Sequence, residues 1–115
     1  MNIENTIYEH CLGNNSPLGT LLNEGHFPDS WIEEFIKLVD QAHKEFEDKK
    51  DLPVKLVGAL HAMTLSPHNR YRTYKLDHNK VNEKTEKELN EIRSRCNLFF
   101  YSKMKNEKDL TNGSN

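Results

Sequence analysis

Six histidines and two cysteines are the side chains of this 115-residue chain best suited to bind a metal or act as nucleophiles. No two histidines stand at the spacings of helical zinc sites, and no cysteine pair joins them at zinc-finger intervals. His61 lies inside an apolar segment, so we expect a hydrogen-bonded interior imidazole there. Cys11 and Cys96 are far apart in sequence, and we expect two partly buried free thiols in preference to a disulfide. The sequence therefore predicts no metal site and no cofactor.

One pair of residues could support catalysis. Arg72 and His78 enclose five residues, a spacing that is similar to the R-x₄₋₆-H motif of HEPN-type ribonucleases, which are also small helical proteins. That resemblance implies an arginine that stabilises phosphate and a histidine that acts as general acid or base. The polar residue that usually follows the arginine is here Thr73, an imperfect match. A small ribonuclease is therefore one alternative function, and a helical adaptor or regulator is another.

Charge divides the chain into two halves. Residues 1–51 hold eleven acidic and four basic side chains, whereas residues 52–115 hold seven acidic and twelve basic ones. The acidic half contains a helix-like segment whose carboxylates could form a surface that steers a basic protein partner; these candidate contacts are Glu33, Glu34, Asp40, Glu45 and Glu47. Pairing with lysines of the same helix, or a role in solubility alone, would explain the same residues without a partner.

The basic half interleaves arginine with tyrosine between Arg70 and Lys75, a composition that could contact phosphates and stack on bases. The isoelectric point of about 6.3 is far below that of typical nucleic-acid-binding modules. We therefore expect these cations to form a solvated surface that pairs with the acidic half, and no nucleic-acid partner. Tyr71 and Tyr74 are candidate aromatic anchors for a protein partner.

The elements that would position these residues all have helical periodicity. The clearest begins after Ser30, which forms a predicted capping box with Glu33, and extends to about residues 48–50. The segment 54–65 is the most apolar in the chain and predicts a buried central helix. Other helices are expected near residues 3–12, 17–24 and 83–105, with Gly13 and Asn14 as a left-handed cap of the first and Asn82 as the N-terminal cap of the last. Residues 68–80 are compatible with a short helix.

The fold class that follows is all-α, a single compact domain of five or six helices over residues 1–105, with a flexible C-terminal tail over residues 106–115. The third, fourth and last long helices should supply the core, and the side chains predicted to be buried are Phe35, Leu38, Leu56, Leu60, Leu89, Ile92 and Phe99. No apolar run is long enough to span a bilayer, and the first ten residues lack the features of a signal peptide. We expect a cytoplasmic protein with no membrane partner.

Three segments, LPVKLVGALHAM, RYRTY and EKTEKELNEIRSRCNLFF, follow one another over about residues 52–101. In order and character they resemble the later portion of small all-helical bacterial immunity proteins, those paired with toxins of contact-dependent growth inhibition. The resemblance implies a protein without catalytic activity that binds one cognate toxin, often a nuclease, and covers its active site. The acidic surface suits this function because nucleases present basic clefts to their substrates. These immunity proteins share no motif from which functional residues could be transferred.

Overall fold

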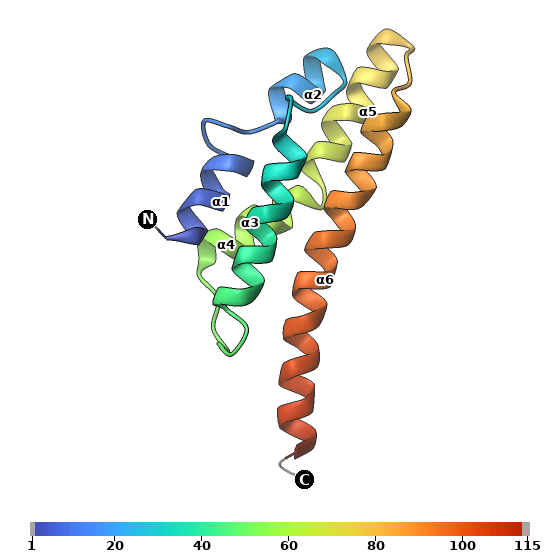
Figure 1. The fold of residues 1–115 in the computed structure, drawn as a ribbon. Helices are drawn as coiled ribbons and strands as arrows, with labels where there is room; N and C mark the ends of the chain where they lie inside the picture. Colours follow the sequence, from blue (N-terminus) through green and yellow to red (C-terminus); the bar gives the residue numbers. More distant parts are fainter. Residues whose placement is uncertain (1, 114–115) are drawn as a thin grey trace.

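Six helices, and no strand, make up the part of the chain that the structure describes. The computed structural model describes the backbone of residues 2–113 and the side chains of residues 2–104. The helices are α1 (Ile3–Cys11), α2 (Leu18–Glu24), α3 (Trp31–Glu45), α4 (Val54–Met63), α5 (Ser66–His78) and α6 (Glu83–Gly113) (Figure 1). The predicted all-α fold class is confirmed.

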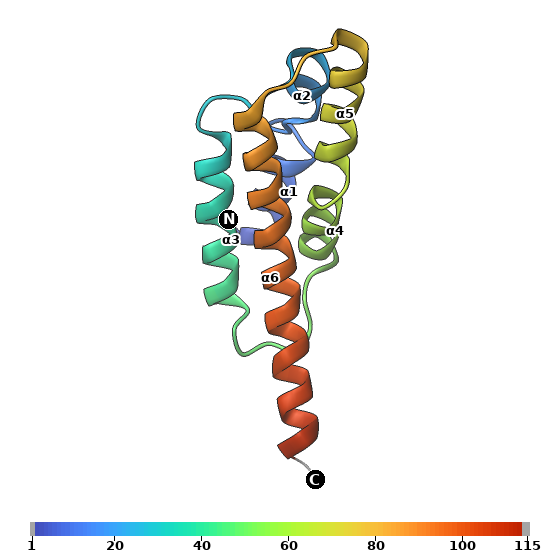
Figure 2. The ribbon, with the colours of Figure 1, turned by 90° about the vertical axis from the view of Figure 1, so that its right-hand side faces the viewer.

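Four of the helices form a closed ring around the core. α3 packs against α1 on one side and α6 on the other, and α4 likewise contacts both α1 and α6. At one end of this bundle α2 packs on α5, while at the other end α6 continues past the remaining helices (Figures 1 and 2). The acidic helix α3 and the apolar helix α4 are therefore placed across the bundle from each other.

The periodicity of the sequence correctly predicted which side chains fill this core. All seven side chains predicted to be buried are 6% exposed or less. The inner line of α6 is also buried along its described length, at spacings of four, three, four and three residues; it consists of Thr85, Leu89, Ile92, Cys96 and Phe99. Such a stripe stabilises a helix because each buried aliphatic or aromatic side chain contributes about 1.5–3 kcal/mol.

α1 is attached to the start of α3 by two interlocked rings. The imidazole of His10 stacks on the indole of Trp31 with ring centroids 4.5 Å apart. Its Nε2 lies 2.9 Å from the carbonyl oxygen of Trp31. In return, Nε1 of Trp31 donates to the carbonyl oxygens of His10 and Asn15, at 3.0 and 2.9 Å. His10 is thus a structural histidine whose polar groups are occupied within the fold.

Gly25 connects the α2–α5 pair to α6. It ends α2 with φ of 74°, a left-handed conformation that glycine adopts without steric cost. A Cβ atom at this position would overlap the ring of Tyr74 on α5. Its carbonyl oxygen accepts a 2.9 Å hydrogen bond from Oγ1 of Thr85 on α6. No larger residue could hold these three helices equally close.

Two of the predicted helix caps are wrong. Ser30 has φ of 63°, and its side chain makes no capping hydrogen bond, so the capping box with Glu33 does not form. The loop from Gly25 enters α3 in a left-handed turn, which turns the hydroxyl away from the free amides. At the end of α1 the cap is Leu12, with φ of −125°, and Gly13 is not left-handed. The predicted cap of α6 is confirmed, because Oδ1 of Asn82 accepts from the amide of Thr85 at 3.1 Å.

Three further predictions about the elements need correction or stay open. α3 ends at Glu45, short of the predicted residues 48–50. α4 is a helix as predicted but is not buried all round, and His61 lies exposed on its outer side, because α1 and α6 cover only the inner side. The backbone of α6 is helical to Gly113, so it includes residues 106–113 of the predicted tail. Their side chains lie outside the described residues, and the flexibility of 106–115 stays a prediction.

Candidate functional site

The five acidic residues predicted to contact a partner all lie exposed on α3 or just after it. We call this set the acidic face; it consists of Glu33, Glu34, Asp40, Glu45 and Glu47. The packing of α3 explains the exposure, because its buried side chains follow a helical stripe that leaves the opposite side to solvent. Between residues 33 and 48 the sequence contains six acids and two lysines, so this surface is net negative.

Most carboxylates of the acidic face have no cation bound within the part of the chain that the structure describes. The in-helix pairs expected from the sequence, such as Glu33 with Lys37, do not form there. Asp40 is the exception, because its Oδ1 lies 3.4 Å from Nη1 of Arg95 on α6. Both side chains of that pair are more than a third exposed, and such a pair contributes little to stability. The negative charge of the face is therefore largely unneutralised.

One acid of α6, Glu88, is influenced by the charge of the acidic face. Burial raises the pKa of the Glu88 carboxyl, and the nearby charge of Glu33 raises it further, while Lys84 and His26 act in the opposite direction. The charge of Glu33 therefore acts on Glu88 from the neighbouring helix, although Lys84 acts more strongly in the opposite direction. Repulsion of this kind within a folded protein costs stability, and an incoming cation would relieve it.

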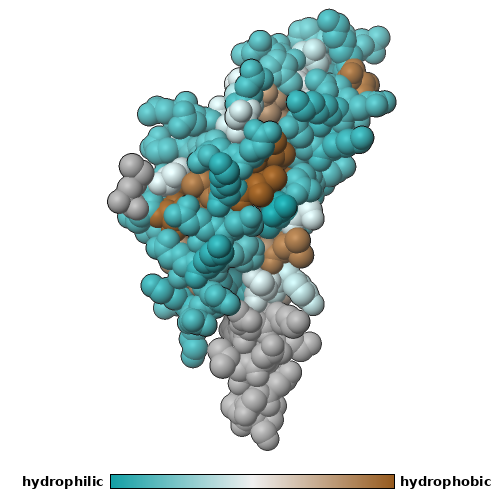
Figure 3. Space-filling model, viewed as in Figure 1, coloured by the Kyte–Doolittle hydropathy of each residue, from teal (hydrophilic) through white to brown (hydrophobic). Residues whose placement is uncertain are grey.

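The face that presents α3 also carries apolar surface. In Figure 3 hydrophilic side chains cover most of this face and surround a narrow hydrophobic band that crosses its centre from α1 towards α6. An apolar centre within a polar, charged rim is the usual anatomy of a protein–protein interface. Charge and hydropathy thus point to the same side of the molecule.

The two tyrosines predicted as anchors do not join the acidic face. Tyr71 is only 3% exposed, and its hydroxyl accepts from the amide of Asn82 at 2.8 Å, so it is part of the fold and is not an anchor. Tyr74 is half-buried against Gly25 and stacks on His78 at 4.5 Å. Both tyrosines lie on α5, which packs on α2 and α4. The aromatic periodicity of this helix therefore marks an internal face.

The possible catalytic pair is exposed but does not converge. Arg72 and His78 lie on the surface of α5. Six residues along a helix correspond to about 9 Å of rise and a rotation of about 120° between the side chains. Nδ1 of His78 lies 3.1 Å from the carbonyl oxygen of Tyr74, in its own helix. Within one chain this geometry does not place both groups on a single phosphate.

Both cysteines are free and buried, as predicted. Burial raises the pKa of the Cys96 thiol to about 12, and it raises the pKa of Cys11 as well. The thiolate is the reactive form, so neither group is an effective nucleophile near neutral pH. Arg95, which precedes Cys96, has its guanidinium on Asp40 and Glu91. The thiols therefore act as small apolar side chains.

Sequence reasoning missed two histidines whose pKa is lowered. Burial lowers the pKa of His68, and the charge of Arg93 adds to the effect; both ring nitrogens are buried without a hydrogen-bond partner. Burial also lowers the pKa of His43, whose ring packs on Phe99 at 4.8 Å. Neither position belongs to a motif, and only the tertiary packing distinguishes them from the other histidines.

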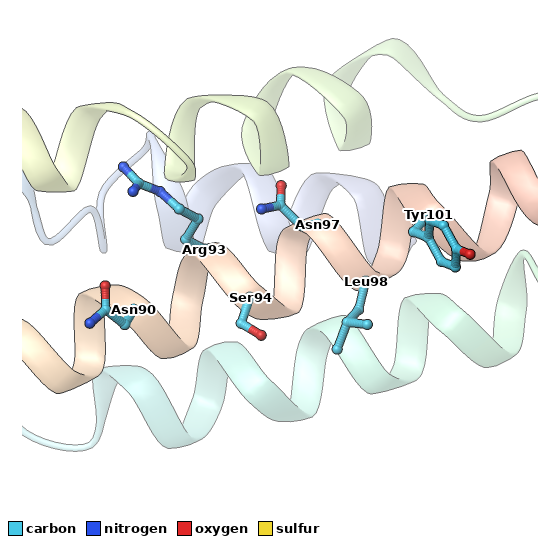
Figure 4. Close-up of a pocket in the computed structure, with 6 residues that line it drawn as sticks. All are labelled: Asn90, Arg93, Ser94, Asn97, Leu98 and Tyr101. Atoms are coloured by element: carbon cyan, nitrogen blue, oxygen red, sulfur yellow. The ribbon is translucent and has the colours of Figure 1, made fainter.

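The outer side of α6 carries a shallow, open depression. Figure 4 shows the six residues that line it, all from this helix: Asn90, Arg93, Ser94, Asn97, Leu98 and Tyr101. Leu98 and Tyr101 are 58% and 63% exposed. The guanidinium of Arg93 donates to the carbonyl oxygen of Thr64 at the end of α4, at 3.2 and 3.3 Å. The depression is too open to enclose a small ligand, and it holds no cluster of titratable groups.

Comparisons with known proteins give no further guide, since no family model, curated protein or solved structure matches the chain. Among the side chains of residues 2–104, no group of three or more potential metal ligands comes together. None of the helices described combines the length and the apolar character needed to cross a bilayer. The acidic face of α3 is therefore the best-supported candidate site.

Proposed function

We propose that this protein binds a basic protein partner through the acidic face of α3 and neutralises it, in the manner of an immunity protein that covers the active site of a toxin nuclease. The observation that carries the proposal is an exposed row of carboxylates, of which only Asp40 has a cation bound among the described side chains. Unpaired surface charge favours rapid, steered association with a surface of opposite sign.

Several features of the surface support the binding of a partner over a role of these acids in solubility alone. Charges spread evenly over a protein would confer solubility, whereas these carboxylates lie along one helix or just after it. The face of the bundle that presents α3 also carries an apolar band, which would supply the buried centre of an interface (Figure 3). A nuclease partner is consistent with this chemistry because its substrate-binding cleft is basic. The site of action would be the cytoplasm, where a nuclease toxin meets its substrate.

The test uses the product of the adjacent gene, if that gene encodes a secreted toxin. A charge-reversed variant would carry Glu34→Lys, Glu45→Lys and Glu47→Lys. The matched control would carry the same change of charge at exposed acids away from α3, with Glu24→Lys, Asp77→Lys and Glu83→Lys. Association rates would be measured over a range of salt concentrations, together with protection of growth when toxin and inhibitor are produced in one cell.

We expect the α3 variant to associate about 10-fold to 1000-fold more slowly at low salt, with a flatter salt dependence and weaker protection of growth. The control should associate nearly as fast as the unmodified protein, because its substitutions leave the acidic face intact. Equal slowing in both variants would assign the effect to net charge and remove α3 from the interface. Lack of binding and protection by the unmodified protein would overturn the inhibitor function.

A further inference from the structure

α4 is apolar on both of its sides, although only one side is buried. Its inner side is covered by the core and consists of Leu56, Ala59, Leu60 and Met63. Its outer side is exposed; we call it the outer face of α4, and it consists of Val54, Val57, Gly58 and His61 with Leu65, which follows the helix. The one charged residue of α4, Lys55, lies at the edge towards α1, where its Nζ donates to Oδ1 of Asn5 at 3.1 Å. Val54 is 87% exposed and Leu65 is 53% exposed. An exposed apolar helix face of this kind usually marks a surface that a partner covers.

The surface continues onto α6, where Arg93 is the cation next to the end of α4. Arg93 binds the carboxyl end of α4 through Thr64, which fixes the two helices side by side at that point. Asn97 and Tyr101 follow Arg93 at intervals of four residues, so they lie on the same side of α6. Figure 4 shows Arg93 and Asn97 directed towards α4 and α5. Met104, 67% exposed, lies one turn beyond Tyr101.

From these observations we propose that the outer face of α4, together with the adjoining surface of α6 from Arg93 to Met104, is the interface of a homodimer. The occupant is a second copy of this chain, related by a two-fold axis that passes near Gly58. The proposal concerns the side of the bundle opposite the acidic face of α3, and it does not depend on the proposed function.

Charge favours a second copy over a charged partner. A two-fold axis brings each surface against itself, so any charged face meets charges of its own sign. The acidic face of α3 would repel its copy in this way, and so would the surface of α5 that carries Arg70 and Arg72. The outer face of α4 has no such repulsion. Nothing on it offers the ion pairs that a strongly basic or acidic partner would recognise.

Shape and area agree with this occupant. Outside the backbone of α4 itself, no atom lies within 4 Å of where a Cβ of Gly58 would be, so the middle of the face is open and another chain can approach the helix closely there. A stable dimer buries about 800 Å² of each partner. A helix of ten residues is only about 15 Å long and cannot provide this area alone. The α6 surface extends it along the bundle.

The first test is the mass in solution, measured by sedimentation equilibrium of the full chain from low to high micromolar concentration. The unmodified protein should have twice the 13.5 kDa mass of the chain. Val54→Glu should reduce it to 13.5 kDa, since this side chain is 87% exposed and its replacement leaves the core intact. The matched control is Leu76→Glu on α5, a side chain 75% exposed, which should leave the dimer unchanged.

The second test locates the axis. Gly58→Cys introduces an exposed thiol into a chain whose own cysteines are both buried. Mild oxidation should join two copies of this variant through a disulfide, whereas Leu76→Cys should stay single. The proposal would be overturned by a mass of 13.5 kDa for the unmodified protein at every concentration. A dimer that is unaffected by Val54→Glu would also overturn it. So would a result in which a disulfide joins two copies of the Leu76→Cys variant but not two copies of the Gly58→Cys variant.

Discussion

α3 and α4 belong to the same bundle and contact the same two helices, but they present opposite chemistry to solvent. α3 combines a buried aromatic stripe with an outer side of carboxylates and lysines. α4 is as well packed on its inner side and exposes valine, glycine and leucine on its outer side. A charged outer side is stable in water with or without a bound partner. An apolar one costs free energy until something covers it.

In both helices the inner side determines packing and the outer side determines which partner could bind. The inner stripe of each is accounted for by the core, so it carries no information about partners. What differs is the outer side: α3 is suited to a partner of opposite charge, and α4 to a surface with no charge. A protein with both could dimerise through one side and keep the other side of each copy free.

The largest effect should come from the inner side of α4. Leu60 is fully buried, so Leu60→Ala removes apolar contacts and leaves a cavity. We expect the free energy of unfolding to fall by about 2–5 kcal/mol. The measurement is urea denaturation followed by circular dichroism, at a protein concentration low enough for the chain to be monomeric.

The matched control lies on the outer side of the same helix. Val54 is 87% exposed, so Val54→Ala should change the free energy of unfolding of the monomer by no more than about 0.5 kcal/mol. A loss as large as that of Leu60→Ala would mean that the outer side of α4 is covered within the monomer. The contrast between α3 and α4 would then disappear.

A smaller effect is expected at the start of α3, at Ser30. Its φ of 63° is strained for serine, and its side chain caps nothing. Ser30→Gly should therefore stabilise the protein by up to about 1 kcal/mol, since glycine adopts this conformation freely. Thermal denaturation of this variant and of Ser30→Ala would test the prediction. If a capping box with Glu33 existed, Ser30→Ala would instead lose about 0.5–2 kcal/mol.

The sequence predicted the helices and their buried stripes well, because both follow from local periodicity. The spacings around Phe35 on α3 and Leu89 on α6 place these residues on the core side with no knowledge of the neighbours. The failures are of another kind. An apolar helix has no polar side to mark the outside, so the exposure of His61 could not be predicted. The left-handed turn at Ser30 depends on how the loop closes.

The candidate site was predictable only in part, for the same reason. The exposure of Glu34 and Glu45 follows from their place opposite or beside a helical stripe. The pairing of Asp40 with Arg95 spans 55 residues and depends on the packing of α3 on α6. Tyr71 was misassigned because an aromatic residue in a basic segment fits both a surface anchor and a core contact. Its hydrogen bonds to the α5–α6 loop decide between them.

Each side of the bundle also contains one histidine with a lowered pKa. These two histidines test whether the charges near α3 and near α4 act differently on a buried imidazole. Burial is the main cause in both, but the neighbouring charges differ. At His43 on α3 the carboxylate of Asp40 favours the protonated form, against Lys103 and Arg95. At His68, next to α4, only Arg93 acts, and it opposes protonation. The two sites therefore differ in their neighbours, because a carboxylate favours the charged imidazole at His43 and none does so at His68.

The smallest expected effect is a difference in acid sensitivity. A pKa lowered in the folded state means that the unfolded chain binds a proton first, so stability falls as the pH drops through about 6.5 towards the lower folded value. His68→Leu removes this proton uptake and two unpartnered buried nitrogens, so its stability should decrease less between pH 7.5 and 5.5. His43→Leu should show a weaker change in the same direction, because Asp40 already offsets part of the cost.

Urea denaturation across this pH range measures both slopes, and a His68→Leu slope equal to that of the unmodified protein would refute the assignment. A larger change in His43→Leu would show that the carboxylates of α3 do not favour a proton there, and the contrast between the two sides would lose its electrostatic basis.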